Sequence, residues 1–406
     1  MNNRILLSTP HMSGNERKYI DEAFETNWIA PLGPNVDSFE KEISIYSGVK
    51  GVTVTNSGTA AIHLALAVLG VGKGDTVFVS TFTFVASANP ILYLGAEPVF
   101  IDSEADTWNM SPDALEIALT EVKAMNQLPK AVIVVNLYGQ SAKMDELNAI
   151  AQKFNVPIVE DAAESLGSTY KNKKSGTLGK LGIYSFNGNK IITTSGGGAL
   201  VSDDEDLLAR ARFLATQAKD PAPYYQHSQV GYNYRMSNVV AGIGRAQLEV
   251  LDERVNRRRE VFNNYQLELG NISGVNFMPE MVETTSNRWL TTLTIDPTKY
   301  NLHPLEFMTM MDEVGIETRA LWKPLHLQPL FNNTKFYTDS ENKKPVSEML
   351  FERGLCLPSG TNMTEFDQLR VITEMKKLLN SSRKRVHVFN WNKKMGSNAK
   401  IQHKIN

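Results

Sequence analysis

Between residues 50 and 205, short apolar runs alternate with longer amphipathic segments, and this alternation restricts the fold more than any other feature. Four of the apolar runs are interpreted as buried strands: 77–80, 98–101, 131–135 and 157–160. Helical patterns fill the gaps, for instance at 111–122 and 144–154. Strands and helices in alternation predict an α/β fold in which a large, mostly parallel sheet carries helices on both faces. Ligands of such sheets bind beyond the carboxyl ends of the strands.

A chain of 406 residues is long for a single core, so we expect two packed domains. The regular alternation ends near Ser237, and residues 239–269 have the pattern of one long charged helix. Strands and helices mix less regularly after it. We therefore predict a large domain at 1–240, whose N-terminal segment could pack elsewhere, and a smaller α+β domain at 241–382.

Composition and charge exclude several classes of protein. Hydrophobic residues make up 42% of the chain and charged residues 21%, as in ordinary globular proteins. The formal net charge of −2 gives no general attraction to nucleic acid or to an anionic membrane. One cysteine, Cys356, cannot form an intramolecular disulfide, and no apolar run is long enough to span a bilayer. We expect a soluble, cytoplasmic protein with no membrane span and no nucleic-acid partner.

The end of the chain differs from the rest. Residues 383–406 contain seven Lys or Arg and no acidic residue. The simplest interpretation is a solvated, flexible basic tail. The alternative is an electrostatic contact with membrane lipids or with an acidic partner.

Two glycine patterns and the histidines carry no predicted site. The run at 70–75 follows a helix instead of opening one, so it is not a dinucleotide fingerprint. The run at 176–180 has the wrong spacing for a Walker loop. The seven histidines are scattered without ligand spacing, and no metal site is predicted.

Three other features indicate chemistry. First, the strand at 52–54 runs into a small-residue turn at Ser57 that opens a helix, where free N–H groups and the helix dipole can bind phosphate. A simple N-cap by Ser57 is the alternative.

Second, Asp161 ends a strand that is predicted to be central, and a carboxylate there could pair with a pyridinium nitrogen. The alternative is that Asp161 serves only as the N-cap of the following helix.

The third feature is Lys190. It lies between two β-like segments, and small residues flank it on both sides, including the glycines at 196–198. Most lysines are solvated surface residues. A lysine amine held in a pocket can instead form a Schiff base with an aldehyde.

The phosphate-binding helix start, the strand-end aspartate and the lysine, in this order, resemble the fold-type-I pyridoxal-phosphate (PLP) enzymes. The detail resembles the DegT-type nucleotide-sugar aminotransferases over about residues 5–380. Further stretches similar to that family are 27–33, 81–86, 136–139, 231–237 and 324–326. The stretches 187–198, 286–290 and 356–361 are similar to its PglE-like members, which use glutamate to aminate C4 of UDP-2-acetamido-2,6-dideoxy-4-keto-hexose in the bacillosamine pathway.

The resemblance implies roles for individual residues. Lys190 would bind the PLP aldehyde, Asp161 would pair with the ring nitrogen, and Phe84 would stack on the ring. Contacts to the cofactor phosphate are implied for Ser57, Gly58, Thr59 and Ser185, with Asn233 supplied by the other subunit of a homodimer. Glu164 takes a place where many relatives carry glutamine, beside the cofactor O3′. Contacts to the sugar nucleotide are implied for Asn27, Trp28, Ile29, Ala30, Tyr184, Arg319, Trp322 and His326.

The sequence thus predicts a PLP-dependent aminotransferase that moves the amino group of L-glutamate to a UDP-linked 4-keto sugar, in a homodimer with shared active sites. Amination at C3 or C4 of a dTDP- or GDP-linked sugar is the main alternative. A PLP-dependent sugar dehydratase is a less favoured alternative, because those relatives carry histidine at the position of Lys190. A non-catalytic regulator of the same fold would not need Lys190, Asp161 and the phosphate site together.

Overall fold

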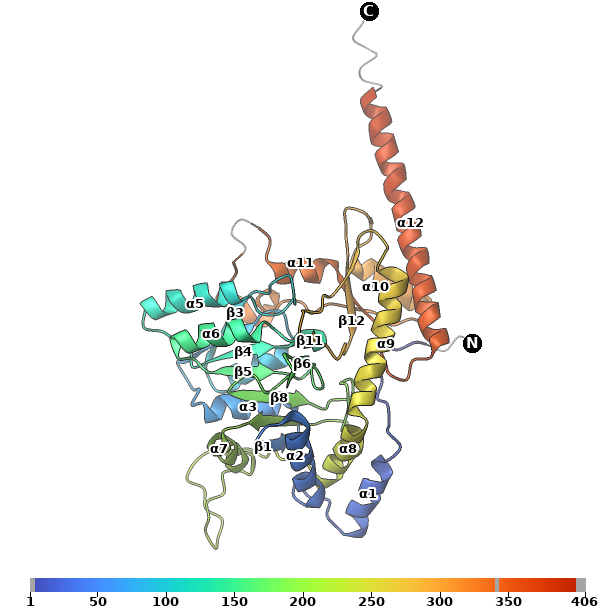
Figure 1. Cartoon of the computed structure of the whole chain (residues 1–406). Coiled ribbons are helices and arrows are strands. Elements are labelled where there is room, and N and C mark those ends of the chain that lie inside the picture. The colour runs from blue at the N-terminus through green and yellow to red at the C-terminus, as the bar shows by residue number, and fades with distance from the viewer. Residues whose placement is uncertain (1–3, 340–342, 399–406) are drawn as a thin grey trace, which may run out of the picture.

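The computed structural model describes residues 4–339 and 343–398, and its main feature is a sheet of eight strands (Figure 1). In spatial order the strands are β1 (Gly51–Thr55), β9 (Gly198–Ser202), β8 (Leu181–Ser185), β5 (Ile158–Asp161), β4 (Ala131–Val135), β2 (Thr76–Ser80), β3 (Glu97–Ile101) and β14 (Phe336–Tyr337). β9 runs antiparallel to both of its neighbours, and all the other pairs are parallel. The predicted α/β fold with a mostly parallel sheet is confirmed.

Helices cover both faces of this sheet. One face packs against α3 (Gly58–Val68), α4 (Asn89–Tyr93) and α7 (Glu205–Ala215), and the other against α2 (Pro34–Ser47), α5 (Pro112–Ala124) and α6 (Met144–Phe154). Strand β4 shows why its apolar run is continuous. Val132 and Val134 join the core under α5 and α6, while Ile133 between them joins the core under α3.

A smaller antiparallel sheet lies beside the large one. Its strands, in spatial order, are β10 (Val275–Phe277), β12 (Thr291–Ile295), β15 (Gly354–Leu357) and β13 (Arg319–Ala320). Helices α9 (Leu251–Leu269), α10 (Pro304–Glu313) and α12 (Glu365–Asn398) pack on it around a separate hydrophobic core. Three short strands form a third sheet: β6 (Thr169–Tyr170), β7 (Lys173–Lys174) and β11 (Thr284–Thr285).

The C-terminal half does not form one continuous unit. The predicted single helix at 239–269 is wrong, because Val250 separates α8 (Asn238–Glu249) from α9. α8 packs on α1 (Glu16–Glu25) and α2, beside the large sheet. The segment after β13 also returns to the large sheet, where it adds η3 (Leu325–Leu327), η4 (Pro329–Phe331) and β14. Residues from the predicted small domain therefore reach the edge of the large sheet.

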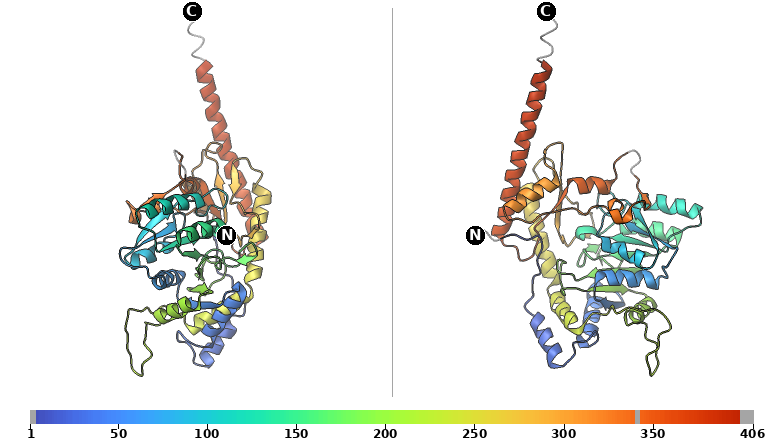
Figure 2. Two further views of the ribbon diagram at one scale, coloured as in Figure 1. Left: turned by 60° about the vertical axis from the view of Figure 1, so that its left-hand side comes forward. Right: turned by 180° about the vertical axis from the view of Figure 1, so that it is seen from behind.

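The predicted basic tail begins within a helix. α12 continues through residue 383 to Asn398 and projects beyond the rest of the molecule (Figure 1; Figure 2). Its core contacts come from its first part, at Val371, Ile372, Met375 and Leu379. Residues 399–406 of the predicted tail lie outside the described residues. Within the part of the chain that is described, no helix is long and apolar enough to cross a membrane.

Candidate active site

The carboxyl ends of the parallel strands meet around a cavity of about 250 Å³. The ends of β5 and β8 contribute Asp161 and Ser185, and the turn between β1 and α3 contributes Ser57 and Gly58. Because β9 runs in the opposite direction, the glycines before it lie at the same edge. The lining residues are Ser57, Gly58, Thr59, Ile62, Thr83, Phe84, Ala86, Ser87, Val135, Asp161, Ala163, Glu164, Ser185, Asn187, Lys190, Gly196 and Gly197.

One end of the cavity is the first turn of α3. The Ser57 hydroxyl caps this helix by accepting a hydrogen bond from the backbone N–H of Ala60, at 3.0 Å. The N–H groups of Gly58 and Thr59 belong to the first turn, whose donors have no partner inside the helix. The turn therefore offers free donors and the positive end of the helix dipole to an anion. Capping by Ser57 and anion binding are compatible here.

Two glycines, Gly198 at the start of β9 and Gly58 at the start of α3, allow these elements to come close. A Cβ on Gly198 would lie 2.5 Å from the backbone nitrogen of Gly58 and 2.5 Å from the backbone of Ser57. A Cβ on Gly58 would lie 3.0 Å from Cβ of Ser185. A side chain does not fit at 2.5 Å from backbone atoms, so the close approach of β9 to the start of α3 requires glycine at 198, and the contact at Gly58 is also tight.

Asp161 is a buried carboxylate in the middle of the site. Its Oδ2 accepts a hydrogen bond from the Ser87 hydroxyl at 2.7 Å, and its Oδ1 accepts one from the Ala163 N–H at 3.2 Å. Burial raises the pKa of Asp161, although these hydrogen bonds and the charge of Lys190 act in the opposite direction. A cationic partner in the cavity would stabilise the ionised form.

Lys190 lies close to a carboxylate and to an aromatic ring. Its Nζ is 3.7 Å from Oε1 of Glu164 and 4.5 Å from the ring centre of Trp289. The Trp289 indole N–H donates to the backbone carbonyl of Asn189 at 2.7 Å, which holds the ring beside the lysine. Burial raises the pKa of Glu164, while Lys190 and a 2.8 Å hydrogen bond from the Tyr138 N–H lower it.

These residues fit the three reactive parts of PLP. The start of α3, with the glycine-dependent close approach of β9, suits a phosphate group. The buried Asp161 suits a protonated ring nitrogen, and Lys190 supplies an amine for the aldehyde. No cluster of side chains that could hold a metal ion occurs among the described residues.

Other residues predicted for the cofactor lie at the edge of the cavity or outside it. Phe84 lines the cavity with half of its surface exposed, and its ring centre is 5.2 Å from that of Trp322. Asn233 is exposed and does not line the cavity of its own chain. Its backbone carbonyl accepts a 3.2 Å hydrogen bond from the Asn56 side chain, in the turn before α3.

The segment from Asn27 to Ala30 lies outside the cavity of its own chain. All four residues are exposed, although Trp28 and Ile29 are large and apolar. Asn238 fixes the segment, because its side-chain amide donates to the Trp28 carbonyl at 2.7 Å and its backbone N–H donates to the Ala30 carbonyl at 2.8 Å. Within one chain the structure does not bring this segment to the cavity.

The prediction that Tyr184 contacts the substrate is wrong. Its side chain is fully buried under α2, and its hydroxyl donates to the Ser175 carbonyl at 2.7 Å. It leaves no surface for a ligand. The neighbouring residue on β8, Ser185, is the one that lines the cavity.

His326 and Arg319 already have protein partners. The His326 ring is 2.7 Å from the Thr81 hydroxyl, 3.2 Å from a Glu348 oxygen, and stacked on Phe336. Arg319 pairs with Glu317 at 3.2 Å. Neither residue lines the cavity around Lys190, so within one chain neither side chain contacts the reacting atoms.

Ser87 and Trp289 belong to the site but were not singled out from the sequence. Trp289 lies in the 286–290 stretch that resembles the PglE-like proteins, and this resemblance is the one feature of the sequence that could identify it as a site residue. Nothing in the sequence distinguishes Ser87 from other serines, because its contact with Asp161 joins residues that are far apart in the chain.

Comparisons with known proteins agree with this geometry. The model of the DegT/DnrJ/EryC1/StrS aminotransferase family matches residues 10–376. EpsN of Bacillus subtilis (strain 168), provisionally named a pyridoxal phosphate-dependent aminotransferase, is 61% identical over 92% of this chain and 95% of its own. GDP-perosamine synthase of Caulobacter vibrioides is 37% identical over 93% of this chain and 98% of its own. Among solved structures, the PLP form of Spr1654 from Streptococcus pneumoniae, provisionally named a sugar aminotransferase, has a TM-score of 0.84 at 27% identity, over 93% of this chain and 99% of its own.

The family match covers all the elements that line the cavity, from β1 to β9. The relatives are also matched over nearly their whole length, so the likeness concerns complete proteins and not a shared fragment. The chain therefore belongs to the DegT/DnrJ/EryC1/StrS aminotransferase family and is a PLP-dependent sugar aminotransferase with the α/β architecture of the fold-type-I enzymes.

Proposed function

We propose that this protein transfers the amino group of L-glutamate to C4 of UDP-2-acetamido-2,6-dideoxy-4-keto-hexose, giving a UDP-4-amino sugar for bacillosamine-type glycans. The observation that carries the amino-transfer chemistry is the meeting of Lys190, Asp161 and the start of α3 in one cavity. The choice of a UDP-linked 4-keto sugar rests on the stretches 187–198, 286–290 and 356–361, which resemble the PglE-like proteins.

The chain's own residues would divide the work as follows. Bound PLP supplies an electron sink and carries the amino group between two substrates. Asp161 would keep the ring nitrogen protonated, and Ser87 orients that carboxylate. Once displaced by an amino substrate, the Lys190 amine would move a proton between the substrate Cα and the cofactor C4′. Glu164 and Trp289, which both lie close to Nζ, would hold the freed amine near the cofactor.

We also propose a homodimer in which each site contains Lys190 of one chain and Asn233 of the other. Asn233 is exposed, in a stretch that resembles the family's reach toward the partner's phosphate. A run of exposed apolar side chains, Phe24, Trp28, Ile29 and Leu32, supports an interface near the N-terminus. This arrangement would give the segment from Asn27 to Ala30 a route to the partner's substrate.

A second candidate function differs only in the substrate. The relative named GDP-perosamine synthase is matched over almost its entire length, which supports a GDP-linked sugar as the alternative. A dTDP-linked sugar, and amination at C3, are the remaining alternatives. All of them use the same cofactor chemistry.

A substrate panel tests the proposal. The purified protein, loaded with PLP and supplied with L-glutamate, is incubated with UDP-, dTDP- and GDP-linked 4-keto sugars, and the products are identified by mass spectrometry and NMR. We expect a 4-amino product from the UDP-linked N-acetylated sugar at the highest kcat/KM. Preference for the GDP- or dTDP-linked sugar, or an amino group at C3, would replace the proposed substrate.

A further inference from the structure

A second cavity of about 330 Å³ adjoins the cofactor cavity. Thr83 and Phe84 line both of them. The second cavity lies between the loop after β2 and the segment that returns from β13 to the large sheet. Its lining residues are Thr83, Phe84, Val85, Trp322, Lys323, Leu325, Gln328, Pro329 and Leu330.

The two cavities meet at a pair of aromatic rings. The centres of Phe84 and Trp322 are 5.2 Å apart, and the rings are inclined at 46°. Trp322 is anchored, because its backbone N–H donates to the Tyr138 hydroxyl at 2.9 Å. The Tyr138 N–H in turn donates to Glu164, which lies beside Lys190. A ligand in the second cavity would therefore adjoin the cavity that contains Lys190.

The lining of the second cavity is apolar apart from a few groups. Leu325, Pro329 and Leu330 form an apolar wall, and Leu330 and Phe84 are well exposed. Lys323 is the one charged residue among the lining residues, and it is exposed. An apolar surface next to a cation suits a ligand that has both a flat ring and a negative charge.

Lys323 differs from its charged neighbours on the same segment. Arg319 pairs with Glu317, and His326 contacts Glu348. Lys323, by contrast, forms no ion pair with a carboxylate among the described residues. Its charge is available to an anion that comes from outside the chain.

A nucleotide sugar has this combination of groups. Its sugar carbonyl must reach Lys190, so its diphosphate and base must lie outside the cofactor cavity. We propose that the second cavity holds the nucleoside diphosphate of the sugar substrate, with Lys323 paired to the diphosphate and the base against the apolar wall. The sugar would then pass Phe84 and Trp322 to reach the cofactor cavity. This inference rests on the proposed function and adds a specificity-determining residue to it.

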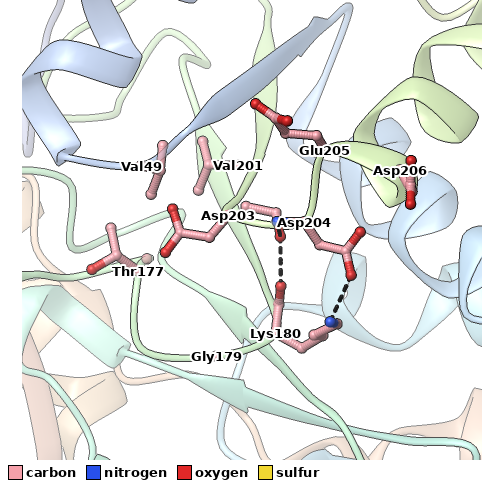
Figure 3. A pocket seen from close by; sticks show the side chains of 11 residues that line it. Val49, Thr177, Gly179, Lys180, Val201, Asp203, Asp204, Glu205 and Asp206 are labelled. Carbon is pink, nitrogen blue, oxygen red and sulfur yellow. Dashed lines mark hydrogen bonds and ion pairs between the residues drawn. The ribbon is translucent and has the colours of Figure 1, made fainter.

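A different cavity, of about 470 Å³, is unsuited to such a ligand. It lies at the opposite edge of the sheet, where β8 begins and β9 ends, and Figure 3 shows the acidic side chains around it. Asp203, Asp204 and Glu205 line it, and its lysine, Lys180, is already paired with Asp204 at 2.6 Å. A diphosphate there would meet like charges.

The test measures nucleotide binding directly. UDP, dTDP and GDP are titrated separately by calorimetry into the full-length, PLP-loaded protein and into its Lys323→Glu and Lys323→Arg variants. For whichever diphosphate binds the natural protein, Lys323→Glu should weaken the affinity by about tenfold or more, and added salt should reduce the difference. Lys323→Arg keeps the charge and should stay within about threefold of the natural protein.

The matched control is Lys335→Glu. Lys335 is an exposed lysine on the same returning segment that does not line the cavity, so its charge reversal should leave the affinity unchanged. Equal affinity in the natural protein and Lys323→Glu would overturn the inference. An equal loss with Lys335→Glu would overturn it too, because the effect would then be general charge. If none of the three diphosphates binds while L-glutamate still changes the visible spectrum of the loaded protein, both the inference and the nucleotide-sugar substrate fall, and the amino-transfer chemistry remains.

Discussion

At the scale of single residues, the site depends on a few polar groups placed where water is excluded. Asp161 is 4% exposed and has two hydrogen-bond donors of its own, Ser87 and the Ala163 N–H. Glu164 is similarly buried, and it is close to Lys190. Burial raises the pKa of both carboxyls, so each is poised to respond to a cation that binds beside it.

For Asp161→Asn we predict that PLP still binds but that kcat falls by about a hundredfold or more. The amide fits the same space and keeps a hydrogen bond, but it cannot stabilise a protonated ring nitrogen. Absorbance of the loaded variant measures retention of the cofactor, and turnover is measured with glutamate and the sugar substrate. Asp113→Asn, at an exposed position, is the control. Near-normal turnover in the loaded Asp161→Asn protein would reject the proposed role.

His63 makes a prediction about stability and pH. Its ring is buried beside Tyr232 and Tyr234, and burial lowers its pKa below the ordinary 6.5. As pH falls, the unfolded chain therefore binds a proton on His63 before the folded chain does. The stability that the neutral, buried ring contributes is present above pH 6.5 and is lost as pH falls through the pKa of the folded protein. Between pH 7 and 5 the free energy of unfolding should fall less in His63→Phe than in the natural protein, by up to about 1.4 kcal/mol per pH unit. An unchanged dependence on pH would contradict this.

Some residues of the site were predictable, and others were not, for a simple geometric reason. Asp161 follows a strong strand pattern, and Lys190 is flanked by glycines, so both could be placed near strand ends. Ser185 and Tyr184 were both expected at the site, but side chains alternate along β8, so only Ser185 lines the cavity and Tyr184 points into the core. Two adjacent residues of one strand cannot both face the same cavity.

At the scale of elements, the close contact between the start of β9 and the start of α3 is the feature that shapes the phosphate end of the site. Gly198→Ala would place a methyl group 2.5 Å from the backbone of Ser57 and Gly58. We predict a stability loss of about 1–3 kcal/mol and a clear loss of PLP affinity, because the first turn of α3 must move.

The control for this prediction lies nearby. Gly188→Ala is near Lys190, yet a Cβ there has nothing within 4 Å. It should keep both stability and cofactor affinity. Thermal melting of the cofactor-free protein and titration with PLP measure the two effects. Equal behaviour of the two variants would mean that the close contact has no part in binding the cofactor.

Elements with strong local patterns were predicted within one or two residues, as at 131–135 and 144–154. The predicted helix at 239–269 was wrong because its sequence remains helix-compatible through Val250, where the chain turns from α1 and α2 toward the smaller sheet. β14 could not be predicted either. It has two residues, and its pairing with β3 joins segments that are far apart in the chain.

At the scale of the whole molecule, the proposed dimer with shared sites would explain why Asn233 and the segment from Asn27 to Ala30 are exposed in the single chain. Consider Lys190→Ala and Asn233→Asp, the second of which sets a carboxylate against the phosphate. Each homodimer should be nearly inactive. In a mixed dimer both changes fall in one site and the other site is natural, so random co-refolding of equal amounts should recover about a quarter of normal activity. If both residues serve a site within one chain, mixing recovers nothing.

The most direct measurement of the central claim is chemical labelling of the lysine that carries the cofactor. The protein loaded with PLP is reduced with borohydride, digested and mapped by mass spectrometry. Lys190 is beside Glu164 and faces the cavity that also contains Asp161, so the pyridoxyl label should be found on the peptide containing Lys190, and Lys190→Ala should remain unlabelled. A label on another lysine of the natural protein, or no label at all, would contradict the proposed active site.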